Sequence, residues 1–318
     1  MKVNPQKAGR TAADALCGFL DAMEAAGTVP RDRAALASDL AAGAGLIRFY
    51  CHGERKANGW AVLHFDGVPA GRFGNWRTGV AASWRGGRTA TLSVAERAAF
   101  TRGRLERHAA RLRAYDDAAT RCLTIWEAAK SASAAHGYLV AKRMAPDGLR
   151  ECGAALLVPM TDAAGRLWSL QSIFPDGNKR FAKDGRVEGM MWRRGDPGAV
   201  IALGEGVATM AAVHAATGLC SVAAFSAGNL AAAAHAVRAQ WPAAMMILCA
   251  DDDVGNVPNK GLDVANAAAR VVGGLVARPP RPPGWREGDG WDFADTMTAT
   301  GGAEAIRRAL NIKNGGAR

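Results

Sequence analysis

From Ala199 onward, short apolar segments alternate with longer segments of helical character. The apolar segments read AVIAL, SVAAF, MMILCA and GLVA, and those between them read VATMAAVHAAT, GNLAAAAHAVRAQW and LDVANAAARVV. Strands that alternate with helices through short links form a parallel sheet with helices on its faces. Gly218 and Gly273 stand where C-terminal helix caps are expected. The sequence therefore predicts an α/β domain with a parallel sheet over residues 198–300, followed by a C-terminal helix or tail over 301–318.

Two β-rich regions are expected before this sheet. In residues 137–197, ALLVPMTD, RLWSLQSIF and NKRF are separated by turn signals, which predicts a meander of strands. Farther upstream, LIRFYCH, GWAVLHFDG and PAGRFGNWRTG alternate apolar and polar residues, which indicates a small antiparallel unit. Helices are expected before that unit, at 11–26 and 35–42. We assign residues 1–92 to a basic N-terminal α+β module.

A helical connector is predicted over residues 93–136, between the two β-rich regions. Ser93 and Glu96 have the spacing of an N-terminal capping box, and helical character continues to about Ala135.

Positive charge gathers in the first half of the chain. The whole chain holds 40 Lys and Arg against 29 Asp and Glu. Residues 1–150 contain 23 of the Lys and Arg but only 13 of the Asp and Glu. This excess suggests a polyanionic partner, although a GC-rich genome produces the same bias. Residues 97–113 hold six arginines and one glutamate, and form either a solvated helix face or a contact with a phosphate backbone. The candidate DNA contacts on this helix are Arg104, Arg107 and Arg111.

Aromatic residues are frequent in the N-terminal module. They form either the core of its β unit or stacking platforms beside arginines. The residues in question are Tyr50, Trp60, Phe65, Phe73, Trp76 and Trp84, with Arg72, Arg77, Arg85 and Arg88 nearby in sequence.

Acidic motifs follow strands of the predicted parallel sheet. GEG, centred on Glu205, comes after the first strand, and DDD at 251–253 comes after the third. The carboxyl ends of parallel strands meet at one edge of a sheet, where ligands of open α/β folds bind. Crowded carboxylates suit a hard divalent cation such as Mg²⁺ or Mn²⁺. The alternative is that the triple Asp forms only a turn and a helix cap. A further acidic motif, DFAD at 292–295, follows the last strand.

Several other classes of site are not supported. The sequence contains no GxGxxG, GxxxxGK[ST], HExxH or GxSxG motif, which argues against a Rossmann dehydrogenase, a P-loop ATPase, a zincin and a nucleophile-elbow hydrolase. The six cysteines are scattered singly, so neither a zinc ribbon nor a disulfide scaffold is expected. The sequence has no long apolar run and no signal-like start, so we expect a cytoplasmic protein without a membrane partner.

These motifs resemble the Toprim domain of bacterial-type primases, topoisomerases and related nucleases. GEGVATMAAVHAATG, VAAFSAGNL, ADDDVGNVPNKG and WDFADTM are similar to the Toprim segment of plasmid- and phage-borne primases, including conjugative-plasmid and satellite-phage types. GLRECGAALLVPMTDAAGRLWSLQSIFPDGNKRF resembles the β-rich subdomain before Toprim in that family, and NGWAVLHFDGVPAGRFGNWRTG resembles its N-terminal module. The resemblance covers roughly residues 45–298.

The resemblance implies roles for the acidic residues. Glu205 matches the motif-one glutamate, and Asp251 and Asp253 match a metal-binding DxD, so these three are the expected catalytic residues and ligands of Mg²⁺ or Mn²⁺. Asp252 occupies the variable middle place. The later motif is often DFND in the relatives, and Ala294 replaces its Asn here. The further metal ligands that it implies are Asp292 and Asp295.

The resemblance also implies basic contacts and some differences. Lys179 and Arg180 match basic residues that in primases face the template and incoming nucleotide, although a surface turn with solubility charges is the alternative. Primases commonly carry a zinc module, but this sequence lacks its cysteine pattern and no zinc is expected. No helicase motif is present, so a helicase partner would be a separate protein. Further cations expected to hold template and phosphates are Arg150, Lys183 and Arg186.

The function implied by the resemblance is that of a DNA primase. Such an enzyme uses a single-stranded DNA template, NTPs and divalent metal ions. The alternatives are a Toprim-type metal-dependent nuclease and a non-catalytic DNA-binding accessory protein. A type I topoisomerase is disfavoured because it requires a nucleophilic Tyr and a large gate domain, and this chain is short and has three Tyr.

Overall fold

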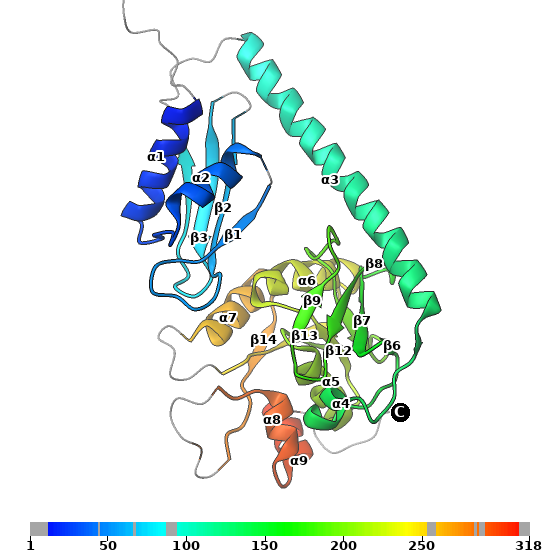
Figure 1. Cartoon of the computed structure of the whole chain (residues 1–318). Helices are drawn as coiled ribbons and strands as arrows, with labels where there is room; N and C mark the ends of the chain where they lie inside the picture. The colour runs from blue at the N-terminus through cyan, green and yellow to red at the C-terminus, as the bar shows by residue number, and fades with distance from the viewer. Residues whose placement is uncertain are drawn as a thin grey trace, which may run out of the picture. The chain divides into compact units, whose positions relative to one another are not determined.

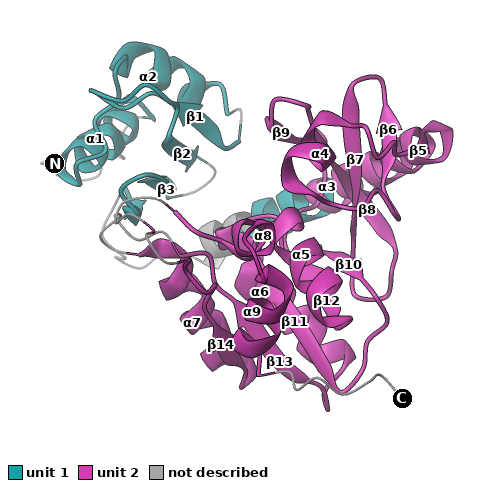
Figure 2. Cartoon of the chain, turned by 90° about the horizontal axis from the view of Figure 1, so that it is seen from below, with its two compact units in different colours: residues 1–110 teal, residues 111–318 magenta. Residues whose placement is uncertain are grey.

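The structure is a computed structural model, and it describes residues 12–43, 45–65, 68–86, 94–252, 259–282, 285 and 290–311. The chain divides into two units, residues 1–110 and 111–318, which Figure 2 colours separately. The buried hydrophobic clusters of each unit are formed by that unit's own residues. The described residues thus form a mixed α/β fold with three separate sheets.

The first unit contains a four-stranded antiparallel sheet, as the alternation in its sequence predicted. Its strands pair in chain order. Helices α1 (Ala12–Ala25) and α2 (Arg33–Ala41) pack on one face of this sheet. The strands are β1 (Ile47–Phe49), β2 (Gly59–His64), β3 (Ala70–Asn75) and β4 (Ala81–Arg85).

Only some of the aromatic residues of this unit form its core. The ring of Phe19 on α1 meets Phe73 and Trp84 edge-on, with centroid separations of 5.6 Å in both cases. Such edge-to-face pairs add to the stabilisation that burial provides. Of the six aromatic residues singled out from the sequence, Phe65, Phe73 and Trp84 belong to or pack on the core. Those outside it are Tyr50, Trp60 and Trp76.

The long helix α3 (Val94–Ala128) is shorter than predicted. It ends at Ala128 rather than near Ala135 because the next residues form β5 (Lys130–Ser131), which pairs with β6 (Arg150–Cys152). The extended backbone of a strand cannot continue the helical hydrogen bonds. Ser93 and the side chain of Glu96, the predicted capping pair, lie outside the described residues.

The second unit begins with an antiparallel meander. Strands β5 and β6 continue into β7 (Ala155–Thr161), β8 (Leu167–Ile173) and β9 (Lys179–Phe181), paired in chain order. The predicted turns are confirmed, because Gly165 and Gly177 have φ values of 92° and 84°. Glycine adopts this left-handed region without strain.

A short helix before β6 was not predicted from the sequence. Helix α4 (Gly137–Lys142) precedes β6 in the chain, and Nδ1 of His136 accepts a hydrogen bond from the backbone of Tyr138 at its start. With only six residues, it is too short for its apolar periodicity to be recognised.

The main sheet has the strand order β10-β12-β11-β13-β14. The last four strands in that order are mutually parallel, as predicted, whereas β10 pairs antiparallel with β12. Strand β10 was missed because its three residues, WRR, lack an apolar pattern. The strands are β10 (Trp192–Arg194), β11 (Val200–Gly204), β12 (Cys220–Ala223), β13 (Met245–Cys249) and β14 (Leu275–Ala277).

Helices cover both faces of the main sheet. Alternate residues of β11 enter two clusters: Ile201 and Leu203 pack with α6 and α7, and Ala202 packs with α5, α8 and α9. Burial on both faces explains why these strands are almost continuously apolar. Gly218 and Gly273 are the predicted C-terminal caps, with φ values of 72° and 62°. The helices are α5 (Val207–Thr217), α6 (Ala227–Gln240), α7 (Lys260–Val272), α8 (Phe293–Thr298) and α9 (Gly302–Ala309), as labelled in Figure 1. Among the described helices, none combines the length and apolar character that crossing a membrane requires.

Candidate active site

The carboxyl ends of two adjacent strands bring acidic residues to one edge of the main sheet. Strands β11 and β13 pair in parallel, with Gly204 opposite Cys249. Glu205 follows β11 directly, and Asp251 follows β13 after one intervening residue. From β11 the chain continues to β12, which is the neighbour of β11 on one side. The next strand, β13, is the neighbour of β11 on its other side, so the strand order changes direction at β11. Ligands of open α/β sheets bind at such a change of direction.

Two glycines allow helices to approach this edge closely. A Cβ on Gly204 would lie 2.5 Å from Sδ of Met210 on α5. A Cβ on Gly261, in the first turn of α7, would lie 2.3 Å from the carbonyl oxygen of Asp251. Neither separation is possible between non-bonded atoms. The Met210 side chain can shift to relieve the first, whereas the second involves the main chain, so Gly261 is the position where a larger residue displaces the helix. The sequence motif indicated the first of these positions and gave no signal for the second.

The later acidic motif begins helix α8. Oδ1 of Asp292 accepts a hydrogen bond from the backbone N–H of Asp295 at 2.8 Å, and Oδ2 of Asp295 accepts one from the backbone N–H of Asp292 at 3.2 Å. This reciprocal pair is a capping box. The hydroxyl of Thr209 on α5 also donates to Oδ2 of Asp292 at 3.2 Å. Asp292 is therefore held beside the helix that follows Glu205.

The middle residue of the DDD motif has a structural role. Asp252 is buried, and its carboxylate accepts hydrogen bonds from Arg281, Arg278 and Asn259. Its backbone forms an antiparallel bridge with Trp291, through hydrogen bonds of 2.9 and 3.0 Å. Burial alone would raise the pKa of Asp252, but the hydrogen bonds from Arg281 and Asn259 and the positive charges outweigh it, and the pKa falls below its ordinary value. Asp252 thus ties the end of β13 to the segment that leads to α8.

Lys179 lies within the electrostatic influence of three carboxylates. The pKa of Lys179 is below its ordinary value, first because the group loses hydration and second because of the charge of Lys142. The negative charges of Glu205, Asp292 and Asp251 raise the pKa and offset part of this shift. Lys179 starts β9, and the residue as a whole is exposed even though its ammonium group loses part of its hydration. The meander therefore presents a cation to the acidic edge of the main sheet.

Helix α4 adds two residues that the sequence did not indicate. Nζ of Lys142 lies 3.9 Å from Oδ1 of Asp295. Tyr138 is buried, and the ammonium of Lys179 lies over its ring, 5.7 Å from the centroid. Burial, followed by the charge of Asp292, raises the pKa of Tyr138 to about 12, so its hydroxyl stays protonated near neutral pH. For Asp295, burial and then the charge of Asp292 raise the pKa.

The other predicted phosphate-binding cations of the meander have local contacts. Arg180 lies over the ring of Phe174 at 5.4 Å, and Arg186 lies over Trp168 at 5.0 Å. Lys183 is exposed. Arg150 stacks on Trp126 at 4.8 Å and donates to main-chain carbonyls at the end of α3.

The three predicted DNA contacts on α3 lie at helical spacing. Arg104, Arg107 and Arg111 are separated by three and four residues, which places them on one side of the helix. Arg104 and Arg111 are exposed, and Arg107 is half-buried.

The donor chemistry at the acidic edge fits a hard divalent cation. Glu205 and Asp251 offer carboxylate oxygens, and Mg²⁺ is commonly held by one or two carboxylates together with water and substrate phosphates. Within the ranges that the structure describes, no group of three or more His, Cys, Asp and Glu side chains is already placed around one point. Asp253, the remaining predicted catalytic residue and ligand, lies outside the described residues.

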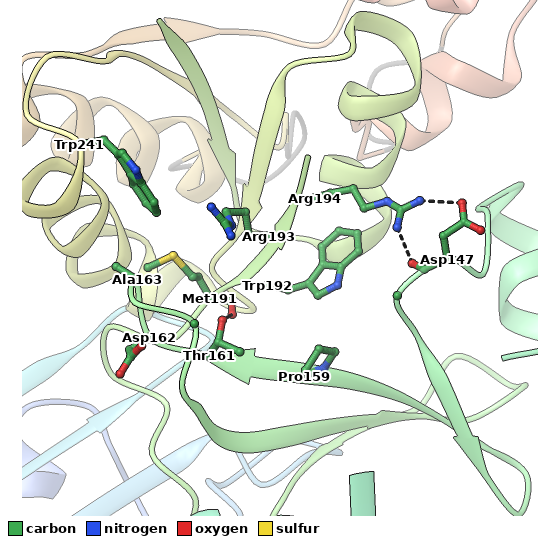
Figure 3. A pocket seen from close by; sticks show the side chains of 12 residues that line it. Asp147, Pro159, Thr161, Asp162, Ala163, Met191, Trp192, Arg193, Arg194 and Trp241 are labelled. Carbon is green, nitrogen blue, oxygen red and sulfur yellow. Dashed lines mark hydrogen bonds and ion pairs between the residues drawn. The ribbon is translucent and has the colours of Figure 1, made fainter. Parts of the chain in front are cut away.

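A separate cavity of about 240 Å³ opens beside β10 (Figure 3). Arg194 closes one side of it by donating to the carbonyl and carboxylate oxygens of Asp147, at 2.6 and 2.7 Å. Arg193 lies over the ring of Trp241 at 5.5 Å. Arg194 pairs with Ser221 near the start of β12, and Trp241 precedes β13. The cavity is therefore near the amino ends of the parallel strands, away from the acidic edge.

Comparison with known proteins finds curated relatives of this chain. No protein-family model matches the chain. A DNA primase TraC of Escherichia coli is 34% identical over 255 residues, which cover 74% of this chain. A second DNA primase TraC of the same species is 36% identical over 239 residues, 70% of this chain. The chain is similar to DNA primases. This confirms the resemblance that the motifs indicated, although the chain spans only 24% and 16% of the lengths of these relatives.

Two solved primase structures show distant likenesses. The primase fragment of the bacteriophage T7 primase-helicase protein gives a TM-score of 0.41 at 18% identity, covering 54% of this chain and 73% of that one. The DnaG primase catalytic domain bound to single-stranded DNA gives a TM-score of 0.37 at 17% identity, covering 54% and 57%. Likenesses at this level carry no weight for function.

Proposed function

We propose that this chain is a DNA primase that makes short RNA primers from NTPs on single-stranded DNA, in the replication of a plasmid or phage. The observation that carries the proposal is its 34% and 36% identity with curated DNA primases over 74% and 70% of its length. The carboxylates gathered at the end of the parallel sheet support it independently.

The proposed catalytic domain is Toprim-like and occupies residues 198–300. Its support is the parallel order β12-β11-β13-β14, with Glu205 and Asp251 following adjacent strands. We keep the other domain limits inferred from the sequence. They are an N-terminal module at 1–92, a helical connector at 93–136, a primase subdomain at 137–197 and a tail at 301–318.

Glu205, Asp251 and Asp253 would hold the divalent metal, Mg²⁺ or Mn²⁺. When bound, the ions neutralise triphosphate charge and stabilise the charge that develops in an in-line displacement. Glu205 would also be placed to accept the proton of an attacking 3′-hydroxyl. Asp292 and Asp295 are proposed as further acidic contributors, although capping α8 already occupies several of their oxygens.

Lys179 would bind the phosphates of the incoming NTP, with Lys142 beside it. Two cations suit a triphosphate, because its negative charge exceeds that of a phosphodiester. Lost hydration and the charge of Lys142 lower the pKa of Lys179. Two cations held close together to bind an anion lower each other's pKa in this way.

The template would be held by basic residues outside the acidic edge. We propose contacts from the meander and from α3 to the phosphate backbone. For Arg150, whose guanidinium already contacts the end of α3, we infer a positioning role. The proposed template contacts are Arg180, Lys183, Arg186, Arg104, Arg107 and Arg111.

The decisive experiment measures RNA synthesis directly. The protein, incubated with single-stranded DNA, labelled NTPs and Mg²⁺ or Mn²⁺, should produce short RNA. Asp251→Asn should abolish synthesis while preserving folding and DNA binding, because it removes an anionic ligand at constant volume. Asp263→Asn, on the exposed side of α7, is the matched control and should retain synthesis.

Each alternative gives a different result in the same assay. A nuclease would cleave DNA in a metal-dependent way without NTPs, and an accessory protein would show neither activity. Absence of RNA with the unmodified protein, or full synthesis by Asp251→Asn, would contradict the proposal.

A further inference from the structure

One face of the sheet in the first unit carries no helix among the described elements of that unit. Residues that point toward α1 and α2 alternate along each strand with residues that point away. Arg48 stands opposite Trp60, and Arg72 stands opposite both Val62 and Ser83. The outward residues of β1–β4 are Arg48, Trp60, Val62, His64, Ala70, Arg72, Gly74, Ala81, Ser83 and Arg85. This set is called the open face below.

Charge divides between the two sides of this unit. The open face carries Arg48, Arg72 and Arg85, all exposed, and none of its residues is acidic. Within the described part of residues 12–86, Glu54 is the acidic residue outside the two helices and their caps, and it is buried. The others are Asp14, Asp21, Glu24, Asp32 and Asp39. The open face is therefore the cationic side, and it suits an anionic partner.

Two aromatic rings, those of Trp60 and Trp76, lie beside Arg48 on this side of the sheet. Trp60 lies across Gly74, where an added Cβ would be 2.7 Å from the indole ring. The ring of Trp76, just beyond β3, is 6.1 Å from that of Trp60 and tilted by 32° to it. Arg48 lies over Trp76 at 4.7 Å. Trp76 as a residue remains 40% exposed, which leaves room for a further contact.

A shallow depression runs across the same face. It has a volume of about 470 Å³. Its lining comes from β2, β3 and β4, and consists of Val62, His64, Ala70, Gly71, Arg72, Ser83, Trp84 and Arg85. Arginines with accessible aromatic rings on an uncovered sheet match the requirements of single-stranded nucleic acid: phosphates bind the guanidinium groups, and unpaired bases stack on the rings. A duplex would not expose its base faces for such stacking.

We propose that the open face binds single-stranded DNA, with phosphates on Arg72 and Arg85 and a base stacked on Trp76. This site lies in a different unit from the acidic edge. It does not depend on primer synthesis, because it rests on the charge and aromatic residues of the first unit alone.

The test measures binding of the full chain to labelled oligo-dT by fluorescence anisotropy, over a series of salt concentrations and without NTPs. Arg72→Gln with Arg85→Gln should weaken binding and reduce the slope of log K against log salt by about 1.4, since each lost phosphate contact contributes about 0.7 on a single strand. The matched control is Arg270→Gln with Arg308→Gln, which removes two exposed charges from the second unit and should leave the slope unchanged.

A second variant tests stacking separately from charge. Trp76→Ala should weaken binding to oligo-dT by at least about five-fold, which is the lower end of base-stacking effects. It should leave binding to an abasic strand of equal length unchanged, because that strand has no base to stack. The arginine variant should weaken both strands. Circular dichroism checks that each variant is folded.

Three results would overturn the proposal. The first is an equal slope of log K against log salt for the open-face double variant and the control double variant. The second is equal weakening of oligo-dT and abasic strands by Trp76→Ala. The third is that the open-face variants weaken binding to oligo-rU as much as binding to oligo-dT, which would overturn the assignment to DNA. Failure of primer synthesis would leave all three measurements interpretable, so the proposed function and this site can fail separately.

Discussion

Asp251 and Asp252 are neighbours in the sequence, yet the structure places them in different surroundings. Asp251 is half-buried near the charge of Lys179, whereas Asp252 is buried among arginines. Alternation of side chains along an extended segment sends consecutive residues to opposite sides. One of these carboxylates can therefore serve chemistry while the other stabilises the fold.

We predict that Asp252→Asn lowers the free energy of unfolding by about 1.5–3 kcal/mol at pH 7, the usual value of hydrogen bonds to a charged group. The pKa of Asp252 is lower in the folded state than its ordinary value of 3.8, so its contribution is present above that pH. The contribution is lost as pH falls through the folded-state pKa. Urea unfolding of both proteins from pH 7 to pH 3 measures this difference.

The expected pattern is a stability difference that persists down to about pH 4 and shrinks only below it. Asp263→Asn, at an exposed carboxylate, should change stability by no more than about 0.5 kcal/mol. A difference between Asp252→Asn and the unmodified protein that disappears well above pH 4 would contradict the structural role of Asp252.

Lys179 allows a prediction about substrate binding. Lys179→Ala should raise the NTP concentration needed for half-maximal primer synthesis by about ten-fold or more, because it removes a charged phosphate contact. Lys130→Ala, at an exposed lysine of β5, is the matched control and should leave that concentration unchanged. Titration of NTP in the primer assay measures both. An unchanged NTP dependence in Lys179→Ala would contradict the proposed role of this lysine, without affecting the proposed role of the carboxylates.

At the scale of elements, the close packing of α7 against the end of β13 positions Asp251. The helix begins with Asn259, whose side chain caps it and also donates to Asp252 at 2.7 Å. Gly261 then lies against the Asp251 carbonyl oxygen. The geometry of the acidic edge therefore depends on a helix as well as on strand ends.

We predict that Gly261→Ala displaces α7 and destabilises the protein by about 1–3 kcal/mol, because the new Cβ has no space beside the Asp251 carbonyl. Gly261→Ala should also reduce primer synthesis, because the displacement of α7 moves Asp251. Gly228→Ala, on α6, is the matched control: nothing lies within 4 Å of its added Cβ, so the helix should gain about 0.5–1 kcal/mol. Thermal unfolding measures both effects. Equal stability of the two variants would show that α7 tolerates the shift.

At the scale of the whole molecule, the two units should unfold in separate steps, because their buried clusters share no residues. Phe73→Leu should lower only the transition of the first unit, by roughly 4–8 °C for each kcal/mol lost. Ile201→Val should lower only the transition of the second, through a loss of about 0.5–1.5 kcal/mol. Scanning calorimetry resolves the two steps. A single transition that moves with either substitution would contradict their independence.

Much of this fold could be predicted from local patterns. The parallel strands, the helices between them, the turns at Gly165 and Gly177 and the caps at Gly218 and Gly273 all follow from periodicity and from backbone conformations that favour glycine. Elements with little pattern, such as β10 and α4, were missed because packing against neighbours stabilises them.

The sequence by itself determined that Glu205 and Asp251 share one edge, since short links between parallel strands leave few other topologies. Only the tertiary structure brought Lys142 to Asp295 and Lys179 to the carboxylates, assigned Asp252 to a buried ion pair, and separated core aromatic residues from those on the open face. The physical reason is that these contacts join residues far apart in the chain. Local periodicity shows which side of an element is buried, and packing decides which elements meet there.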